Sequence, residues 1–280
     1  MPGEHGPGIV VHDLGGRGIP VVLAHATGLH GLVWRPLADA VTEHLRCFSF
    51  DARRHGDSRP GPGDDHAWPE MARVALAVID GLGLDQPVGV GHSSGASILL
   101  LAEQARPETF RALYCFEPVI VPVHPPLGRD RDNWLAQAAR RRREVFASRR
   151  EAYAHYAAKP PFSTLAPAAL AAYVDHGFHD LPDGRVQLKC HREHEALVHE
   201  MATDHDAFAR LPTVGCPVLV AYGGCSEAWV PALVEAQTAP LPDVTVEVLA
   251  GLGHLGPLED PAAVARSLLR FVAAHGGRRG

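Results

Sequence analysis

Cysteine is scarce in the sequence, and the cysteines that occur are scattered. The 280 residues include five of them, and no CxxC pair is present. An odd number of dispersed thiols suggests neither a disulfide framework nor the ligand spacing of a structural zinc site. We therefore expect reduced thiols, the state that a cytoplasm maintains.

The sequence also lacks an excess of positive charge and any long hydrophobic run. Its 26 basic and 32 acidic residues give a net charge of −6, so no electrostatic field would attract a nucleic acid. Residues 1–8 lack the basic and apolar stretches of a signal peptide, and no run approaches the roughly 18 apolar residues of a membrane span. We expect a cytoplasmic protein with a small-molecule substrate, no nucleic-acid partner and no membrane partner; a homodimer is compatible with the sequence.

Short β-branched runs alternate with longer Ala- and Leu-rich runs, which is typical of βα units on a mostly parallel sheet. With 46% hydrophobic residues, the chain has enough apolar surface for a sizeable core. Residues 121–212 break the alternation, because they are rich in Arg, Ala and His with helical spacing and several prolines. We predict one α/β core, residues 1–120 and 213–280, interrupted by a helical cap, residues 121–212.

A G-x-S-x-G motif at residues 91–95 makes Ser93 a candidate nucleophile. A short predicted strand precedes it and an apolar helical run follows, and small flanking residues allow the sharp turn that exposes the hydroxyl. The segment GVGHSSG does not match a dinucleotide-binding loop, because its third glycine comes one place too late. We predict a catalytic serine and no cofactor.

His254 is the candidate base for Ser93. It lies in the loop GLGH, which follows the predicted strand 244–249. Its side chain would therefore stand at the carboxyl end of a strand, where α/β proteins build their sites. The serine thus comes first along the chain and the histidine last, which is the order found in enzymes whose nucleophile lies in a turn between a strand and a helix.

Four separated segments together resemble the signature loops of the α/β-hydrolase superfamily. They are HATGLHGLVW (residues 25–34), FDARRHGDS (50–58), GHSSG (91–95) and GLGHLGPLEDP (251–261). The resemblance covers about two thirds of the chain and leaves the cap outside. It implies an α/β-hydrolase fold: a mostly parallel eight-stranded sheet flanked by helices, a helical cap after the sixth strand, a Ser/His/acid triad and an oxyanion hole.

The same resemblance implies which residues form the oxyanion hole, where the negatively charged oxygen of the tetrahedral intermediate would be stabilised. The family uses the backbone N–H after the nucleophile and one from the loop after an early strand, which correspond by position to Ser94 and Thr27. Ala26 departs from the glycine that the family usually has. Trp34, near this loop, and Trp134, one of several cap aromatics, are candidates for lining a largely apolar substrate pocket, although cap aromatics would equally anchor the cap to the core.

The acid of the triad is displaced from the family's usual position. After the strand that follows the cap, Ser226 stands where most relatives have Asp, with Glu227 one place beyond. Glu117 ends the strand after the nucleophile helix, 24 residues beyond Ser93, a position that some superfamily members use. A carboxylate leaving an apolar strand is costly to bury unless it is paired, and the imidazole of His254 would pair it. We favour Glu117 and keep Glu227 as the alternative.

Histidine is abundant, but its spacing does not predict a metal site. His194 and His199 flank Glu195 five positions apart, whereas an HExxH zinc site needs a spacing of four to place both rings on one helix face. We therefore predict no metal ligands.

Two reactions fit the predicted triad. One is hydrolysis of a carboxylic ester or lactone through an acyl-enzyme, and the other is hydrolytic C–C cleavage of a ketone-activated substrate, because the family uses related triads for both. We favour the ester or lactone, which demands least of the site. A non-catalytic ligand-binding protein on the same fold is the alternative from another class; such relatives usually lose a triad member, whereas Ser93 and His254 are both present.

Overall fold

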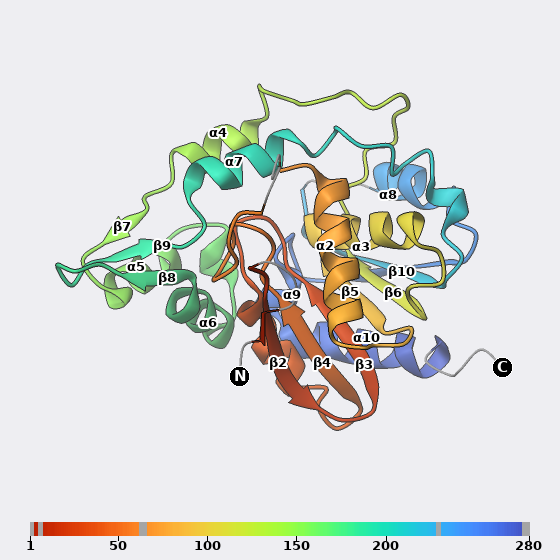
Figure 1. Ribbon diagram of the computed structural model, residues 1–280, viewed down its shortest axis with the longest axis horizontal. Helices are drawn as coiled ribbons and strands as arrows, with labels where there is room; N and C mark the ends of the chain where they lie inside the picture. The colour runs from red at the N-terminus through yellow and green to blue at the C-terminus, as the bar shows by residue number, and fades with distance from the viewer. Residues whose placement is uncertain (1–2, 5–7, 62–65, 228–230, 276–280) are drawn as a thin grey trace.

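An eight-stranded sheet forms the centre of the molecule (Figure 1). The computed structural model describes residues 3–4, 8–61, 66–227 and 231–275. The strands, in spatial order, are β1 (Gly3–Glu4), β2 (Val10–Gly16), β4 (Leu45–Phe50), β3 (Ile19–Ala24), β5 (Val88–His92), β6 (Ala112–Phe116), β10 (Val218–Gly223) and β11 (Val244–Leu249). The pairs β1·β2 and β2·β4 are antiparallel, and every later pair is parallel. The predicted α/β-hydrolase fold is confirmed.

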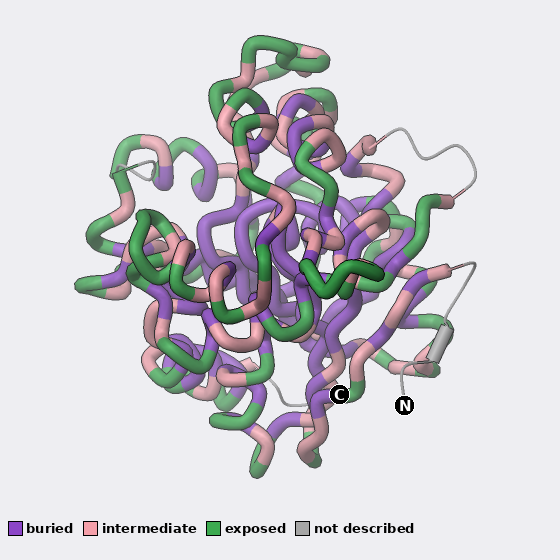
Figure 2. Tube along the Cα trace, turned by 90° about the vertical axis from the view of Figure 1, so that its left-hand side faces the viewer, coloured by how far each residue is buried: buried purple, intermediate pink, exposed green. Residues whose placement is uncertain are grey.

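Helices cover both faces of this sheet, and β3 shows why its sequence is apolar throughout. Successive side chains of a strand point to opposite faces: Val21 and Leu23 belong to one buried cluster, whereas Val22 and Ala24 belong to the other. Figure 2 shows the buried residues gathered in the interior. The helices that flank the sheet and carry residues of these clusters are α1 (Arg35–Asp39) and α10 (Pro261–His275) in the first cluster, and α2 (Trp68–Gly81) and α3 (Ser94–Ala105) in the second. Shorter elements are η1 (Gly31–Trp34), η3 (Leu211–Thr213), α8 (Pro231–Thr238) and α9 (Gly256–Glu259).

The segment between β6 and β10, here called the cap, contains helices and a small sheet. Its helices are α4 (Trp134–Arg140), α5 (Arg149–Ala157), η2 (Phe162–Thr164), α6 (Pro167–Gly177) and α7 (Arg192–Glu200). Its strands β7 (Val145–Phe146), β9 (Val186–Leu188) and β8 (Phe178–Asp180) form an antiparallel sheet. The cap follows the sixth strand and is mainly helical, as predicted. It also contains three strands of two or three residues, which are too short to show a period of two in the sequence. Within the described chain, none of the helices is both long and apolar enough to span a bilayer.

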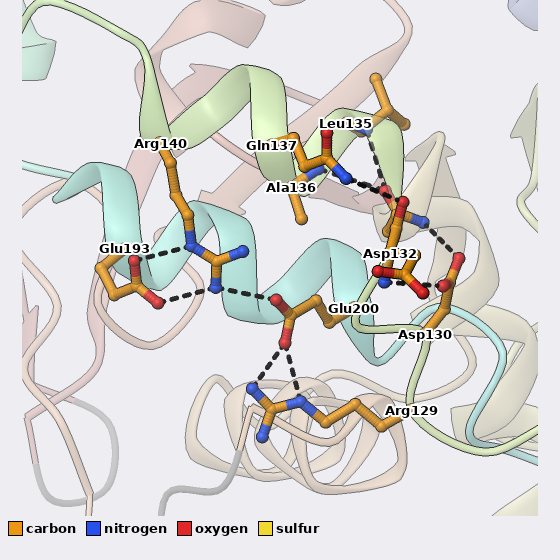
Figure 3. Close-up of polar contacts among 10 residues, drawn as sticks. Arg129, Asp130, Asp132, Leu135, Ala136, Gln137, Arg140, Glu193 and Glu200 are labelled. Atoms are coloured by element: carbon orange, nitrogen blue, oxygen red, sulfur yellow. Dashed lines mark hydrogen bonds and ion pairs between the residues drawn. The ribbon is translucent and has the colours of Figure 1, made fainter.

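Ion pairs tie α4 to α7 across the top of the cap (Figure 3). Arg140 contacts Glu193 at 2.8 Å and Glu200 at 2.7 Å, and Arg129 Nε donates to Glu200 at 2.7 Å. Burial alone would raise the pKa of the Glu200 carboxyl, but the hydrogen bonds from both arginines outweigh it and lower that pKa. Charge-assisted hydrogen bonds therefore cross-link the two helices, in addition to a small cluster of buried alanines between them.

Candidate active site

Ser93 occupies a strained turn between β5 and α3. Its φ of +55° and ψ of −121° lie outside the regions that L-residues favour. The turn is possible because glycines lie two positions before and two positions after Ser93. A Cβ on Gly91 would lie 2.3 Å from the Ala96 Cα, and one on Gly95 would lie 2.3 Å from the Ala24 carbonyl oxygen. The motif predicted from the sequence therefore forms the sharp strand-to-helix turn that presents a serine side chain.

The structure brings Glu117 to His254. The His254 Nδ1 lies 2.5 Å from Glu117 Oε2, and the carboxylate at the end of β6 is fully buried. Glu117 also accepts hydrogen bonds from the Gly223 amide at 2.9 Å and from the Ser226 hydroxyl at 3.0 Å. Glu227 is exposed and, within the described residues, makes no hydrogen bond or ion pair. Because Nδ1 faces the carboxylate, Nε2 is the ring nitrogen left to act as a base.

His92, the residue before the candidate nucleophile, anchors the loop that carries His254. Its Nε2 lies 2.7 Å from the His254 carbonyl oxygen, which can only accept, so this nitrogen bears the proton. Burial, with His254 nearby, lowers the pKa of His92 well below 6.5, so the ring stays neutral. On the other side, the Gly253 amide donates to Glu259 at 2.7 Å. The first variable position of the motif thus has a positioning role that the sequence analysis missed.

The two predicted oxyanion residues are in direct contact. The Thr27 amide donates to the Ser94 hydroxyl oxygen at 2.9 Å, and the Thr27 hydroxyl lies 2.9 Å from the same oxygen. Ser94 is the first residue of α3, and its side chain is buried. The structure therefore brings both residues together, but the Thr27 amide is already hydrogen-bonded to a side chain, and their role as oxyanion donors stays a prediction.

Two neutral histidines hold the loop that carries Thr27. His25 accepts the Ala52 amide at Nε2, 2.9 Å away, and burial lowers its pKa to about 3. His55 accepts the Gly28 amide at Nε2, 3.1 Å away, and burial lowers its pKa as well. Both rings must remain uncharged to accept these bonds. Both belong to the family-like segments, but only the assembled fold shows what they bind.

An ionic pair from the cap lies against this loop. A Cβ on Gly28 would stand 2.8 Å from Glu195 Oε1 and 3.2 Å from Arg142 Nη1. Arg142 pairs with Glu195 and donates to the hydroxyls of Tyr173 and Tyr156, at 2.5 and 3.2 Å. Burial opposes the charge on Arg142, but Tyr173 and Glu195 outweigh it and raise its pKa well above the ordinary value. A charged pair, predicted by nothing in the sequence, therefore borders the site.

The two tryptophans predicted to line a pocket lie in very different surroundings. Trp134 begins α4 and is 70% exposed to solvent, so its ring lines no enclosed pocket and that prediction is corrected. Trp34 is 2% exposed within the core cluster, and its indole Nε1 has no hydrogen-bond partner among the described residues. Its role at the pocket stays a prediction. Five buried or half-buried aromatics of the cap contact one another and belong to or pack against the core cluster: Phe146, Tyr156, Phe162, Tyr173 and Phe178.

Comparison with known proteins places this geometry in a wider context. The family model described as "Alpha/beta hydrolase family" matches residues 21–267. Strigolactone esterase D14 of Arabidopsis thaliana is 26% identical over 256 residues, which cover 89% of this chain and 91% of that protein.

Within the described residues, no group of three or more His, Cys, Asp or Glu side chains is placed to hold a metal ion.

Solved structures share the fold. E-2-(acetamidomethylene)succinate hydrolase superposes with a TM-score of 0.80 at 19% identity, covering 95% of each chain. The enol-lactonase from Burkholderia xenovorans LB400 superposes with a TM-score of 0.71 at 18% identity, covering 95% of this chain and 97% of that one. At such identities the likeness concerns the fold, and the chemistry has to be argued from the residues of this chain.

Proposed function

Because the chain belongs to the alpha/beta hydrolase family and is a hydrolase, we propose that it cleaves a carboxylic ester or lactone through an acyl-enzyme on Ser93. The observation that carries this proposal is the contact between His254 and Glu117. A buried carboxylate 2.5 Å from Nδ1 orients the imidazole and stabilises its protonated form. This arrangement has the chemistry of a general base, and Ser93 directly follows β5, the strand that pairs with β6.

In the proposed reaction, Ser93 Oγ attacks the carbonyl carbon while His254 Nε2 takes its proton. The carbonyl oxygen becomes an oxyanion, to which the Ser94 amide at the start of α3 would donate a hydrogen bond. The tetrahedral adduct collapses, the alcohol leaves with the proton from His254, and the acyl group stays on Ser93. Water, deprotonated by His254, then attacks this ester, and the departing Ser93 regains the proton.

The preference for an ester or lactone over a carbon–carbon bond rests on what the site must supply. An alkoxide needs one proton, which His254 has just received, whereas C–C cleavage must also stabilise a carbanion. Similarity to a protein named strigolactone esterase supports the same choice. The acyl part of the substrate would meet the Arg142–Glu195 pair beside the oxyanion loop, so we propose that it carries a polar group in addition to apolar surface.

The decisive experiment uses an activated fluorophosphonate, which labels a serine only when a base and an oxyanion hole activate it. We expect the intact mass to increase by one adduct, and we expect Ser93→Ala to remain unlabelled while folding normally. An exposed serine of the cap, Ser163→Ala, is the matched control and should label like the unmodified protein. Absence of labelling in well-folded protein would instead support the non-catalytic binding protein.

If Ser93 is labelled, panels of matched esters, lactones and diketones separate the two reactions. We expect turnover of esters or lactones to exceed that of C–C substrates. Turnover confined to the diketones would contradict the preferred reaction while leaving the triad intact.

A further inference from the structure

The contact between Thr27 and Ser94 leaves one donor unused at the reactive end of α3. Ser94 Oγ accepts the Thr27 amide at 2.9 Å and lies 2.9 Å from the Thr27 hydroxyl. Two hydroxyls joined by one hydrogen bond consume one of their two protons. Within the described residues, no further hydrogen bond is made by either hydroxyl, so one O–H remains available to another acceptor.

The position of this O–H relates it to the proposed reaction. Ser94 directly follows the candidate nucleophile Ser93 and is the first residue of α3, a helix of 12 residues. The backbone N–H of Ser94 is the family's first oxyanion donor by position, and the unfulfilled amides at a helix N-terminus favour negative charge there. The hydroxyl and the amide of one residue therefore border the place where the oxyanion would form.

The Thr27 amide is held behind this hydroxyl. The Thr27 amide already donates a 2.9 Å hydrogen bond to Ser94 Oγ, and Ser94 is only 3% exposed. An oxyanion could accept a hydrogen bond from this amide only by displacing Ser94 Oγ. The oxyanion could accept a hydrogen bond from the Ser94 O–H without such a displacement. Each bond that Ser94 Oγ accepts also polarises its own O–H and strengthens it as a donor.

We infer that the second oxyanion donor of this protein is the Ser94 hydroxyl, with the Thr27 amide and hydroxyl polarising it from behind. The inference rests on the proposed function, because it requires Ser93 to attack a carbonyl. It departs from the family's arrangement, in which the loop amide itself contacts the oxyanion. No bond is made or broken by Ser94; its proton is donated in a hydrogen bond and retained.

Ser94→Ala is the direct test, measured with the best ester or lactone of the panel. We expect kcat to fall about 10- to 100-fold with KM changed less than about threefold, because a donor acting on the transition state is lost. The rate of fluorophosphonate labelling of Ser93 should fall in parallel, since the adduct carries the same oxygen. Thr27→Val should cause a smaller loss, and Thr27→Ser should restore most of it.

Several outcomes would overturn the inference without touching the proposed function. An unchanged or faster Ser94→Ala enzyme would show that the Thr27 amide takes the oxyanion once it is free. A Thr27→Val loss exceeding that of Ser94→Ala would assign the donor to Thr27. A KM effect without a kcat effect would make Ser94 a binding residue only. Failure of the unmodified protein to label at Ser93 would instead refute the proposed function itself, and thermal unfolding of each variant identifies any that fail to fold.

Discussion

The buried carboxylate of the candidate site and the two buried carboxylates of the cap are held by different groups. Glu117, in the core, accepts hydrogen bonds from an amide, a hydroxyl and an imidazole, and no Arg or Lys pairs with it in the described part of the chain. Glu195 and Glu200, in the cap, are paired with arginines. The cap carboxylates are thus neutralised and act as cross-links, whereas the charge of Glu117 remains available to stabilise a proton on His254.

Removing the charge of the core carboxylate should have the largest effect. We expect Glu117→Gln to lower kcat by about four orders of magnitude, the scale known for replacing a triad carboxylate by its amide, because the imidazole loses its orientation and its counter-charge. Steady-state kinetics on the best substrate measure it. The matched variant Glu227→Gln should stay within about twofold, and equal losses in the two variants would contradict the assignment of the acid.

Acid should destabilise the protein through core histidines that cannot ionise in place. Burial lowers the pKa of His25 to about 3 and that of His30 to about 4, against 6.5 when unfolded. Both contribute stability above pH 6.5 that is lost as the pH falls toward these values, about 1.4 kcal/mol per pH unit each. From pH 6.5 to 5, these two histidines alone should lower the free energy of unfolding by about 3 kcal/mol.

Chemical denaturation across this pH range measures the drop. His30→Gln keeps a donor for the Tyr173 carbonyl, 3.2 Å from His30 Nε2, but removes the titrating group. The free energy of unfolding of this variant should therefore fall less between pH 6.5 and 5, by about 1.5 kcal/mol, than that of the unmodified protein. An unaltered slope in His30→Gln would show that other groups carry the acid sensitivity.

Breaking the cap pair beside the oxyanion loop should affect stability more than chemistry. Glu195→Ala leaves the Arg142 guanidinium buried without its counter-charge, and we expect a loss of about 3 kcal/mol in the free energy of unfolding. Asp80→Ala, which breaks the exposed pair with Arg106, is the matched control and should cost less than about 1 kcal/mol. Comparable losses from the two would show that the cap pair is solvated in solution.

The smallest effect is expected at Ser226, which donates to Glu117 from the position where most relatives carry the acid. Ser226→Ala removes one of three hydrogen bonds to that carboxylate, a net contribution of about 1 kcal/mol. We expect kcat to fall about fivefold. A loss approaching that of Glu117→Gln would mean that the serine, rather than the imidazole, fixes the carboxylate.

The sequence predicted features that depend on local rules. The turn at Ser93 needs small neighbours, and a buried strand that ends in an acid needs a partner, so residue types, together with the family resemblance, pointed to the turn at Ser93 and to the pairing of Glu117 with His254. Features that arise from contacts distant in sequence could not. Arg142 and Glu195 are 53 residues apart, and the capture of the Thr27 amide by Ser94 depends on a side-chain rotamer that no motif encodes.

Exposure was the other point at which the sequence was insufficient. Trp134 begins α4, a helix with one face packed on α7 and the other in solvent. Residue type alone favours burial of an indole and does not tell which face it occupies. The structure leaves its ring 70% exposed. The short strands of the cap escaped prediction because two residues show no periodicity.

The location of Glu117 on β6 also bears on how this protein can diversify. The proposed nucleophile and the proposed acid follow adjacent parallel strands joined by a single helix, and both precede the cap in the chain. Only His254 must be supplied from beyond it. Insertions, deletions or exchanges in the cap leave the proposed acid next to its serine, and the loop after β10 supplies a hydrogen bond to this carboxylate rather than the carboxylate itself. The cap can therefore change, and with it the substrate range, while two of the three proposed catalytic residues keep their relative positions.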